Sequence, residues 1–240
     1  MLDSLKSIIS HETFDPRWIG LLTNPFYFAR KGLFSSISAL APKMSQGRML
    51  DVGCGSKPYK NLFKSFDYVG MELQGASKRA DFYYDGNIFP FKDGSFDSVL
   101  TSQVFEHVFN PNEFLSEIFR VLKDEGTLLM TVPFVWDEHE QPQDFARYSS
   151  FGLRHLLKLH GFEIVESRKT MDDVRVIFQM INAFIYKKTV CNNSWLNLIL
   201  TAILMAPFNI IGEVCCMVLP KNSDLYLDNV ILARKKMSSR

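Results

Sequence analysis

The pattern of hydrophobic and polar positions changes at Arg48. From this residue on, short apolar runs that end in glycine or an acid alternate with longer segments of helical spacing. Such alternation is typical of a parallel sheet whose strands are joined by helices. The predicted strands are residues 48–53, 67–72, 81–84, 96–102, 126–132, 162–168 and 226–234, and the predicted helices are 57–65, 111–122 and 150–160. The pattern therefore predicts an α/β protein with a mostly parallel, seven-stranded sheet.

The segments outside this alternation are helical in character. Residues 1–47 mix polar helix formers with aromatic residues, and their apolar positions have the spacing of one helix face. Residues 173–223 separate the sixth predicted strand from the seventh and form a helical insertion. We expect one domain over 1–240, with a central part at 48–172 and the last strand and tail at 224–240.

The inserted segment contains an apolar stretch at 195–219, in which Glu213 is the only charged residue. About 20 apolar residues suffice to cross a bilayer. However, Pro207 interrupts the stretch, and Asn197, Asn209 and Glu213 are costly at bilayer depth. We expect a pair of short helices that form a cap or an oligomer contact. Helices lying in the membrane interface and a true membrane span remain open as alternatives.

Lysines flank this stretch on both sides: Lys187, Lys188 and Lys221. They could meet anionic lipid headgroups, or they could only keep the ends of the stretch soluble.

Composition and charge exclude several classes of protein. With 240 residues, 47% of them hydrophobic and 22% charged, the chain can bury a sizeable core, so it is neither disordered nor fibrous. Lys and Arg total 27 against 26 acids, a net charge of +1, which lacks the positive excess expected of a nucleic-acid-binding protein. The four cysteines form no C-x-x-C pair and have no companion histidines at zinc-ligand spacing, so we expect neither disulfides nor a metal site. Free thiols and no recognisable leader favour a cytoplasmic location.

The segment from Leu50 to Ser56, LDVGCGS, ends the first predicted strand. Its glycines allow a tight turn and a close approach of the backbone to a ligand. A dinucleotide fingerprint would have a third glycine at position 58, which here is Pro58. Nicotinamide or flavin binding is therefore disfavoured.

Two acids follow the next two predicted strands. Glu72 stands where a carboxylate can accept hydrogen bonds from both hydroxyls of a ribose. Asp85, with Gly86 and Asn87, offers a carboxylate and an accessible backbone, which suit an adenine amino group and ring nitrogen. The alternatives are an ordinary exposed acid at Glu72 and a plain Asp-Gly-Asn turn at 85–87.

Taken together, these stretches resemble class I S-adenosylmethionine-dependent methyltransferases, within them the type 11 small-molecule branch. The matching segments are LDVGCGSKP at 50–58, YVGMEL at 68–73, YDGNIFPFKDGSFDSVLTSQVFEHV at 84–108 and FLSEIFRVLKDEGTLLMTVP at 114–133. In order and spacing the resemblance covers about residues 48–168. It implies a Rossmann-like fold, S-adenosylmethionine as cofactor and methyl transfer as the reaction, with residues 1–47 as a cap over the cofactor site.

The resemblance also implies roles for individual residues. The methionine part of the cofactor would contact the glycine loop, the ribose would contact Glu72, the adenine would contact the 85–86 turn, and the sulfonium would lie beside 102–103. The implied cofactor-binding residues are Asp51, Gly53, Cys54, Gly55, Glu72, Leu73, Asp85, Gly86, Ser102 and Gln103. Position 57 is Lys instead of the third glycine of the commonest family loop, which leaves the conformation of this loop open.

Two histidines are candidates for a base that takes a proton from an oxygen acceptor, because neutral imidazole titrates near working pH. For His107, a hydrogen bond to Glu106 or to backbone is the favoured alternative. His139 lies in a polar loop after the fifth predicted strand, where open α/β sheets place their substrate. A solvated surface loop is the alternative there.

The same loop carries the pattern H-E-x-P-x-D-x-x-R-Y, which is similar to methyltransferases of bacterial polysaccharide and cell-envelope glycan pathways. The resemblance implies an acceptor wall formed by Glu138, Asp144, Arg147 and Tyr148. The alternative is that Arg147 only pairs with Asp144 and that Tyr148 anchors the core.

The sequence therefore predicts transfer of a methyl group to an oxygen of a small or glycan-like acceptor. A lipid-linked acceptor, peripheral contact with the inner face of the membrane through 195–219, and a homo-oligomer are further expectations. A quinone or lipid methyltransferase, a non-catalytic scaffold with the cofactor fold and, last, a nicotinamide-binding protein remain as alternatives.

Overall fold

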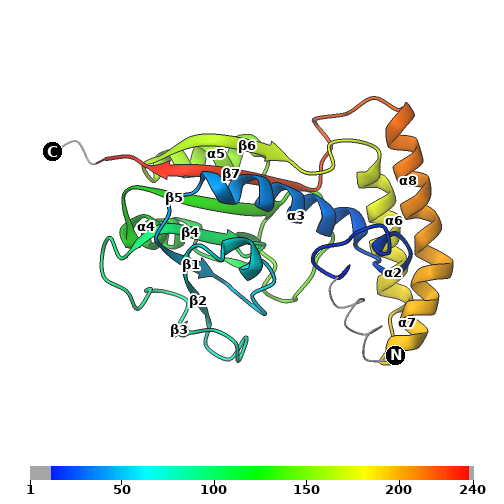
Figure 1. Ribbon diagram of the computed structural model, residues 1–240, viewed down its shortest axis with the longest axis horizontal. Helices are drawn as coiled ribbons and strands as arrows, with labels where there is room; N and C mark the ends of the chain where they lie inside the picture. Colours follow the sequence, from blue (N-terminus) through cyan, green and yellow to red (C-terminus); the bar gives the residue numbers. More distant parts are fainter. Residues whose placement is uncertain (1–11, 238–240) are drawn as a thin grey trace. The chain divides into compact units, whose positions relative to one another are not determined.

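The computed structural model describes residues 12–237. Residues 1–11 lie outside the described residues. They include the beginning of the predicted cap and most of the segment from which we expect no leader. Contacts divide the chain into two compact units (Figure 1). We call Ser36–Phe134, Glu138–Arg168 and Asn229–Arg240 the sheet unit, and Met1–Ser35, Val135–Asp137 and Lys169–Asp228 the helical unit.

The sheet has seven strands in the order β3-β2-β1-β4-β5-β7-β6. The strands are β1 (Arg48–Val52), β2 (Asp67–Leu73), β3 (Phe82–Tyr84), β4 (Phe96–Ser102), β5 (Leu122–Pro133), β6 (Phe162–Lys169) and β7 (Asp228–Lys235). Each neighbouring pair from β3 to β5 is parallel, whereas β7 runs opposite to β6 (Figure 1). The predicted fold class, a Rossmann-like mostly parallel sheet of seven strands, is confirmed.

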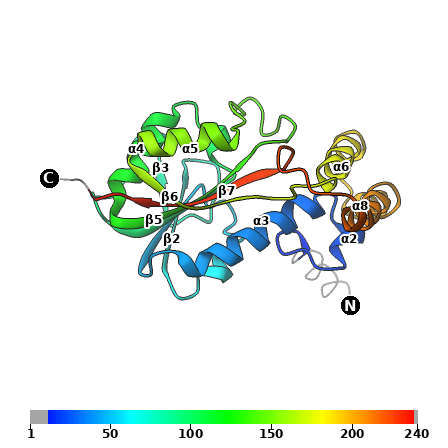
Figure 2. The same cartoon turned by 90° about the horizontal axis from the view of Figure 1, so that it is seen from above.

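The apolar runs of the sequence form the central strands because these strands are covered on both faces. Leu50 in β1, Val99 in β4 and Leu128 in β5 are fully buried in one core cluster. The amphipathic helix α4 (Pro111–Val121) begins with its proline in the first turn and turns Leu115 and Ile118 inward. Helix α5 (Ser150–Leu159) lies on the same face of the sheet (Figure 2).

The predicted helix over 57–65 is wrong. The structure has only a short 3-10 helix, η2 (Lys60–Phe63), between β1 and β2. Lys57 adopts a left-handed backbone conformation, with φ of 60°, so a regular right-handed helix does not start at this residue. The side chain of Phe63 is buried and anchors the short segment. The other predicted elements are present, although β5 begins at Leu122, earlier than expected.

The helical unit contains α2 (Gly20–Thr23), α6 (Arg175–Thr189), α7 (Ser194–Leu200), α8 (Ala206–Val218) and the first part of α3 (Tyr27–Leu40). A single π-helical segment, Thr201–Met205, connects α7 to α8. The expected pair of short helices is therefore wrong, because α7 and α8 form one continuous helix. Pro207 lies in the first turn of α8, where its missing N–H is tolerated beside the wider π turn.

This continuous helix, Ser194–Val218, is the one helix within residues 12–237 that is long and apolar enough to cross a membrane, with a mean hydropathy of 1.9. Two of its polar residues, Asn209 and Glu213, point inward. Asn209 is buried, donates to the carbonyls of Leu21 and Asn24 at 3.0 and 3.1 Å, and accepts from Asn182 at 2.9 Å. Glu213 forms an ion pair with Lys31 at 2.8 Å. These groups, which the sequence marks as costly in a bilayer, are satisfied within the protein.

Candidate functional site

The glycine loop follows β1 and is bonded to β2. The N–H groups of Gly53 and Cys54 donate to the carbonyl of Met71 at 2.9 and 3.1 Å. Gly53 has φ of +71°, and a Cβ there would approach a Val104 methyl carbon to 2.3 Å. Gly55 has φ of +49°, and nothing lies within 4 Å of the position of its missing Cβ. The loop therefore packs tightly at Gly53 and leaves open space for a ligand at Gly55.

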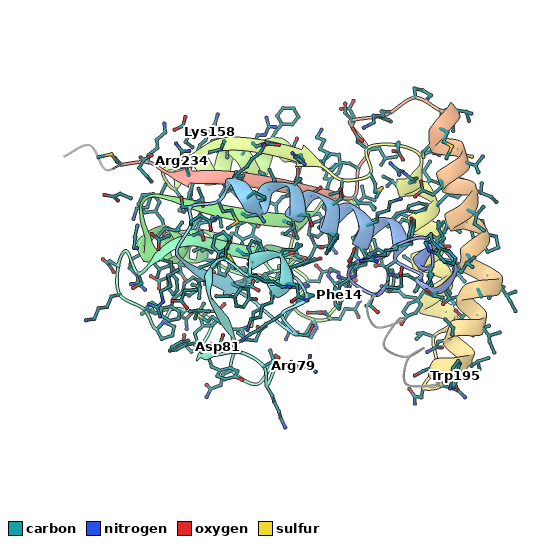
Figure 3. All side chains as sticks on the ribbon, viewed as in Figure 1. Phe14, Arg79, Asp81, Lys158, Trp195 and Arg234 are labelled. Atoms are coloured by element: carbon teal, nitrogen blue, oxygen red, sulfur yellow. The ribbon has the colours of Figure 1, made fainter. Side chains whose placement is uncertain are left out.

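Lys57 occupies the place of the third family glycine, and it takes a glycine-like conformation. Its φ is 60°, and its ammonium donates to the Asp81 carboxylate at 2.7 Å. Asp81 precedes β3 (Figure 3) and also accepts the N–H of Gly70 at 2.7 Å. A Cβ at Gly70 would lie 2.5 Å from the Lys57 Cε. This ion pair and the absence of a side chain at residue 70 hold the loop in the left-handed conformation.

Asp51 stands at the inner end of the loop and is 4% exposed. Its carboxylate accepts a hydrogen bond from the Tyr68 hydroxyl. Burial raises the pKa of Asp51 to about 7, whereas the hydrogen bond from Tyr68 opposes this rise. Burial likewise raises the pKa of the neighbouring Cys54 thiol to about 12, so this thiol is unreactive. A cationic group of a ligand would convert Asp51 to its charged form.

Glu72 lies at the end of β2 and bonds the glycine loop. One carboxylate oxygen accepts the N–H of Gly55 at 2.9 Å, and the other accepts the N–H of Leu73 at 2.9 Å. Each oxygen retains a second lone pair for another donor. The carboxylate is thus fixed beside the open space at Gly55, and its ribose role stays a prediction.

The two other predicted cofactor segments follow β3 and β4. Asp85 accepts the N–H of Asn87 at 2.9 Å, which lowers its pKa, and Gly86 has φ of +96°, so this backbone is a tight turn. The Ser102 hydroxyl contacts the Thr131 hydroxyl at 2.8 Å. Gln103 takes a φ of +57° and donates its N–H to the Thr131 carbonyl at 3.0 Å.

Because β3, β2, β1 and β4 are adjacent and parallel, all these segments lie at one edge of the sheet. This edge, at the carboxyl ends of the strands, is where open α/β sheets bind their ligands. The cofactor roles of the individual residues stay predictions.

The two candidate bases come together. His107 belongs to the 3-10 helix η3 (Phe105–His107) after β4, and His139 lies in the loop after β5; their ring centroids are 4.8 Å apart. The His107 Nδ1 lies 2.6 Å from the Gln143 carbonyl oxygen, which is the backbone contact that the alternative interpretation anticipates. Its Nε2 lies 3.8 Å from the Glu106 carboxylate.

Glu106 is the residue that the sequence analysis missed as a member of the site. Its side chain is fully buried, and its backbone carbonyl accepts the N–H groups of Phe145 and Ala146 at 2.9 and 3.2 Å. A buried carboxylate is rare unless it is paired with a charge. Its position directly before His107 was the only feature of the sequence that could have indicated a role for Glu106. Burial of its side chain after a strand end cannot be deduced from one sequence.

The predicted acceptor wall is built around an ion pair. Arg147 donates to both carboxylate oxygens of Asp144, at 2.6 and 2.7 Å, and this pairing holds the pKa of Asp144 well below its usual range. Tyr148 stacks on Phe105 with a centroid distance of 4.9 Å, and burial raises its pKa. The structure therefore contains both contacts of the alternative interpretation. Glu138 accepts from the Gln141 amide at 3.2 Å. Contacts with an acceptor stay predictions.

Residues 50–130 match the family model of a methyltransferase domain. An uncharacterized protein of Methanocaldococcus jannaschii is 37% identical over 49% of this chain and 54% of its own length. A protein of Mycolicibacterium smegmatis named a probable S-adenosylmethionine-dependent methyltransferase is 26% identical over 62% of this chain and 63% of its own. The ubiquinone/menaquinone biosynthesis C-methyltransferase of a Ruegeria species is 28% identical over 52% of this chain and 53% of its own. This chain thus spans about half to two thirds of these relatives.

Solved structures share the fold. An S-adenosylmethionine-dependent methyltransferase from Archaeoglobus fulgidus aligns with a TM-score of 0.57 and 16% identity, covering 91% of this chain and 100% of that one. At this identity the likeness concerns the fold alone. Residues 50–130 of this chain thus match a methyltransferase domain, and the chain has the fold of solved methyltransferases.

Proposed function

We propose that the protein transfers a methyl group from S-adenosylmethionine to an oxygen atom of a small or glycan-like acceptor. The observation that carries this proposal is the arrangement of two sets of residues at one edge of the sheet. The glycine loop with Asp51 and Glu72 follows β1 and β2, and the two histidines follow β4 and β5. A cofactor site and a proton-accepting site on adjacent strands can hold donor and acceptor within reach of each other.

The residues present fit the cofactor. The space beside Gly55 is open, and Glu72 is fixed there with acceptor capacity for hydroxyl groups. Asp51 lies at the inner end of the same loop and can pair with the amino group of the methionine part. When bound, S-adenosylmethionine supplies a methyl group that is already activated by its sulfonium. The protein then has to orient the acceptor, exclude water and hold its proton.

The histidines are suited to hold that proton. A carbonyl oxygen only accepts hydrogen bonds, so the contact with Gln143 places the hydrogen of His107 on Nδ1. In the neutral ring Nε2 then carries the lone pair, which can accept a proton from an acceptor hydroxyl. His139 lies against the Asp144 carboxylate, with Nδ1 3.3 Å from Oδ2. The guanidinium of Arg147 lies 3.3 Å from the same Nδ1, so the ring is held between these two side chains.

A second candidate function is methylation of a quinone or another lipid. It is favoured by the similarity to the quinone C-methyltransferase of Ruegeria and by the exposed large hydrophobic side chains of α7 and α8. This candidate uses the same cofactor residues and differs only in the acceptor. Product analysis separates the two functions, because methyl ethers and C-methyl groups differ in mass-spectrometric fragmentation and in stability to acid.

We also propose that the continuous helix α7–α8 contacts a membrane surface, which would bring the enzyme to a lipid-linked acceptor at the inner face of a membrane. Apolar side chains project from one side of this helix, and Figure 3 labels Trp195 at its beginning. The exposed large residues are Trp195, Leu196, Ile199, Ile203, Leu204, Ile210, Ile211, Val214, Met217 and Val218. We call this set the apolar face.

Three features of the helical unit support a lipid surface for the apolar face. The polar residues Asn209 and Glu213 of the same helix are turned inward and bonded. Lys187, Lys188 and Lys221 flank the helix in the sequence. Lys187 and Lys221 form ion pairs with Asp137 and Asp172, and their side chains are 47% and 74% exposed, so anionic headgroups can reach them. An apolar surface of this extent is unusual on a monomer that has no partner. A second copy of the chain is the alternative occupant.

Calorimetric titration of the purified protein with S-adenosylmethionine, S-adenosylhomocysteine and NADH tests the cofactor part of the proposal. We expect micromolar binding of the first two compounds and none of NADH. Incubation with methyl-labelled S-adenosylmethionine and extracted cell-envelope glycans, lipid-linked sugars or quinones then identifies the acceptor class by transfer of the label.

A further inference from the structure

Two exposed phenylalanine rings lie against each other in the sheet unit, on the two segments that carry the candidate bases. Phe109 follows η3, and Phe145 lies in the loop after β5. Their ring centroids are 5.3 Å apart, and the rings meet edge to face, with an angle of 71° between their planes. Phe109 is 76% exposed and Phe145 is 46% exposed. We call these two residues the aromatic pair.

Backbone contacts hold the aromatic pair beside the histidines. The N–H of Phe145 donates to the carbonyl of Glu106 at 2.9 Å. The Nδ1 of His107 lies 2.6 Å from the carbonyl oxygen of Gln143, which is two residues before Phe145. Phe109 in turn is two residues after His107. The segment after β4 and the loop after β5 thus bring the candidate bases and the aromatic pair to the same part of the sheet unit.

The start of α4 does not require an exposed ring at Phe109. Asn110 is the N-cap of this helix, so Phe109 is the residue that in many helices packs on the fourth helical residue, here Phe114. Phe114 is buried in the core, whereas the ring of Phe109 stays largely exposed and lies against Phe145. The ring of Phe109 therefore adds little buried area to the fold, and a bound molecule would gain free energy by covering it.

The polar residues of the loop after β5 indicate what kind of molecule this is. The loop exposes two carboxylates, Glu138 and Glu140. An ionised carboxylate only accepts hydrogen bonds, so a ligand that reaches it has to bring donors. The guanidinium of Arg147 could donate to a ligand, but both of its terminal nitrogens already bond Asp144, at 2.6 and 2.7 Å. A ligand with several hydroxyl groups fits these residues better than a quinone, whose carbonyl oxygens only accept.

We propose that the aromatic pair stacks on the apolar face of a pyranose ring of the acceptor, and that Glu138 and Glu140 accept hydrogen bonds from its hydroxyl groups. This inference rests on the proposed function, because it specifies the acceptor of that reaction as a glycan. The face of an aromatic ring carries partial negative charge, which attracts the weakly positive C–H groups of a sugar. Stacking fixes the sugar ring and so orients one hydroxyl for methyl transfer.

Saturation-transfer NMR on the full chain, with and without S-adenosylhomocysteine, tests the inference and requires no turnover. The probes are the trisaccharides maltotriose, mannotriose and chitotriose, with menadione as a quinone. We expect at least one trisaccharide to receive saturation mainly at the C–H groups of one ring face. Phe109→Ala and Phe145→Ala should each weaken its binding by about five- to tenfold. Phe109→Tyr keeps the aromatic ring and should retain binding.

Phe82→Ala is the matched control. Phe82 forms a similar edge-to-face contact with Phe91, at a centroid distance of 5.0 Å, but it belongs to the outer strand β3, which is four positions from β5 in the sheet. This substitution should leave trisaccharide binding unchanged. In a methyl-transfer assay with extracted glycans, Phe145→Ala should raise KM by the same factor and change kcat less than about twofold, because the histidines are retained.

Three results would overturn the inference: no saturation of any trisaccharide, equal saturation in the parent and the Phe109→Ala/Phe145→Ala double variant, and saturation of menadione alone. Calorimetry with S-adenosylmethionine separates it from the proposed function. Binding of S-adenosylmethionine without binding of any trisaccharide contradicts only this inference, whereas trisaccharide binding without S-adenosylmethionine binding contradicts only the proposed function.

Discussion

At the scale of single residues, Gly53 and Gly55 belong to the same loop but have different structural roles. A Cβ at Gly53 would clash with Val104, whereas a Cβ at Gly55 would enter open space. We predict that Gly53→Ala lowers the free energy of unfolding by about 2–4 kcal/mol, through the clash and the left-handed backbone. Gly55→Ala should cost only about 1–2 kcal/mol in stability.

The same pair separates stability from binding. Because the open space at Gly55 is the proposed place of the cofactor, Gly55→Ala should lose most S-adenosylmethionine binding while it stays folded. Thermal unfolding and calorimetry of both variants check this. Equal stability losses would contradict the packing argument, and unchanged binding by Gly55→Ala would contradict the placement of the cofactor.

Glu72 gives a second prediction at this scale. Its carboxylate is fixed at the open space beside Gly55, and loss of hydrogen bonds from a charged group costs about 1–3 kcal/mol. Glu72→Ala should therefore weaken S-adenosylmethionine binding by about one to two factors of ten. Glu163→Ala, which removes an exposed acid from β6, is the matched control. The ribose assignment fails if both variants bind equally well.

Asp51 predicts a pH dependence. Burial raises its pKa to about 7, so the folded protein binds a proton at Asp51 more tightly than the unfolded chain does. This protonation adds to the free energy of unfolding at low pH, and the added stability is lost as pH rises toward 7. Cofactor affinity has the opposite pH dependence and rises with pH, because the amino group of the cofactor pairs with the ionised form of Asp51. Affinity should rise by about tenfold or more between pH 5.5 and 7.5, with release of a proton.

Calorimetry in buffers of different ionisation enthalpy measures that proton directly. In Asp51→Asn the rise should disappear and binding should be weak at both pH values. A slope that persists in this variant would assign the titration to another group.

At the scale of elements, the strands were predictable because each contains a short apolar run between turn or helix signals, as in β1 and β4. Helix α4 was predictable from its proline start and its amphipathic spacing. The absence of a regular helix over 57–65 could not be predicted, because the left-handed backbone of Lys57 depends on an ion pair with Asp81, which is distant in sequence. Continuity through Pro207 likewise depends on a π turn that no local pattern indicates.

We predict that the apolar face of α7–α8 binds lipid vesicles. The full chain should float with vesicles that contain anionic lipid and should bind neutral vesicles less, because the flanking lysines contribute electrostatic attraction. A Val214→Ser/Met217→Ser variant should lose most of this binding, since these side chains are 57% and 79% exposed. Phe151→Ser, which removes an 80% exposed residue of α5, is the control.

Two results would contradict a lipid occupant. The first is equal flotation of all three proteins. The second is a vesicle-free dimer that the Val214→Ser/Met217→Ser change dissociates, which analytical ultracentrifugation would detect and which would assign the apolar face to a second copy of the chain.

At the scale of the whole molecule, the sheet edge collects residues from segments far apart in sequence. The cofactor motifs could be located from the sequence because each follows a strand end in a fixed order. The meeting of His107 with His139, and the burial of Glu106 between β4 and β5, could not, because they depend on how two loops fold back on the sheet. What such an edge binds follows from its chemistry and not from the fold alone.

Calorimetric titration of the purified full chain with S-adenosylmethionine, S-adenosylhomocysteine and NADH tests the proposed cofactor site most directly. We predict that one equivalent of each of the first two compounds binds with micromolar affinity, that Glu72→Ala weakens this binding, and that NADH gives no heat. Binding of NADH alone, or no binding of S-adenosylmethionine by folded protein, would show that this edge of the sheet is not a methyl-donor site.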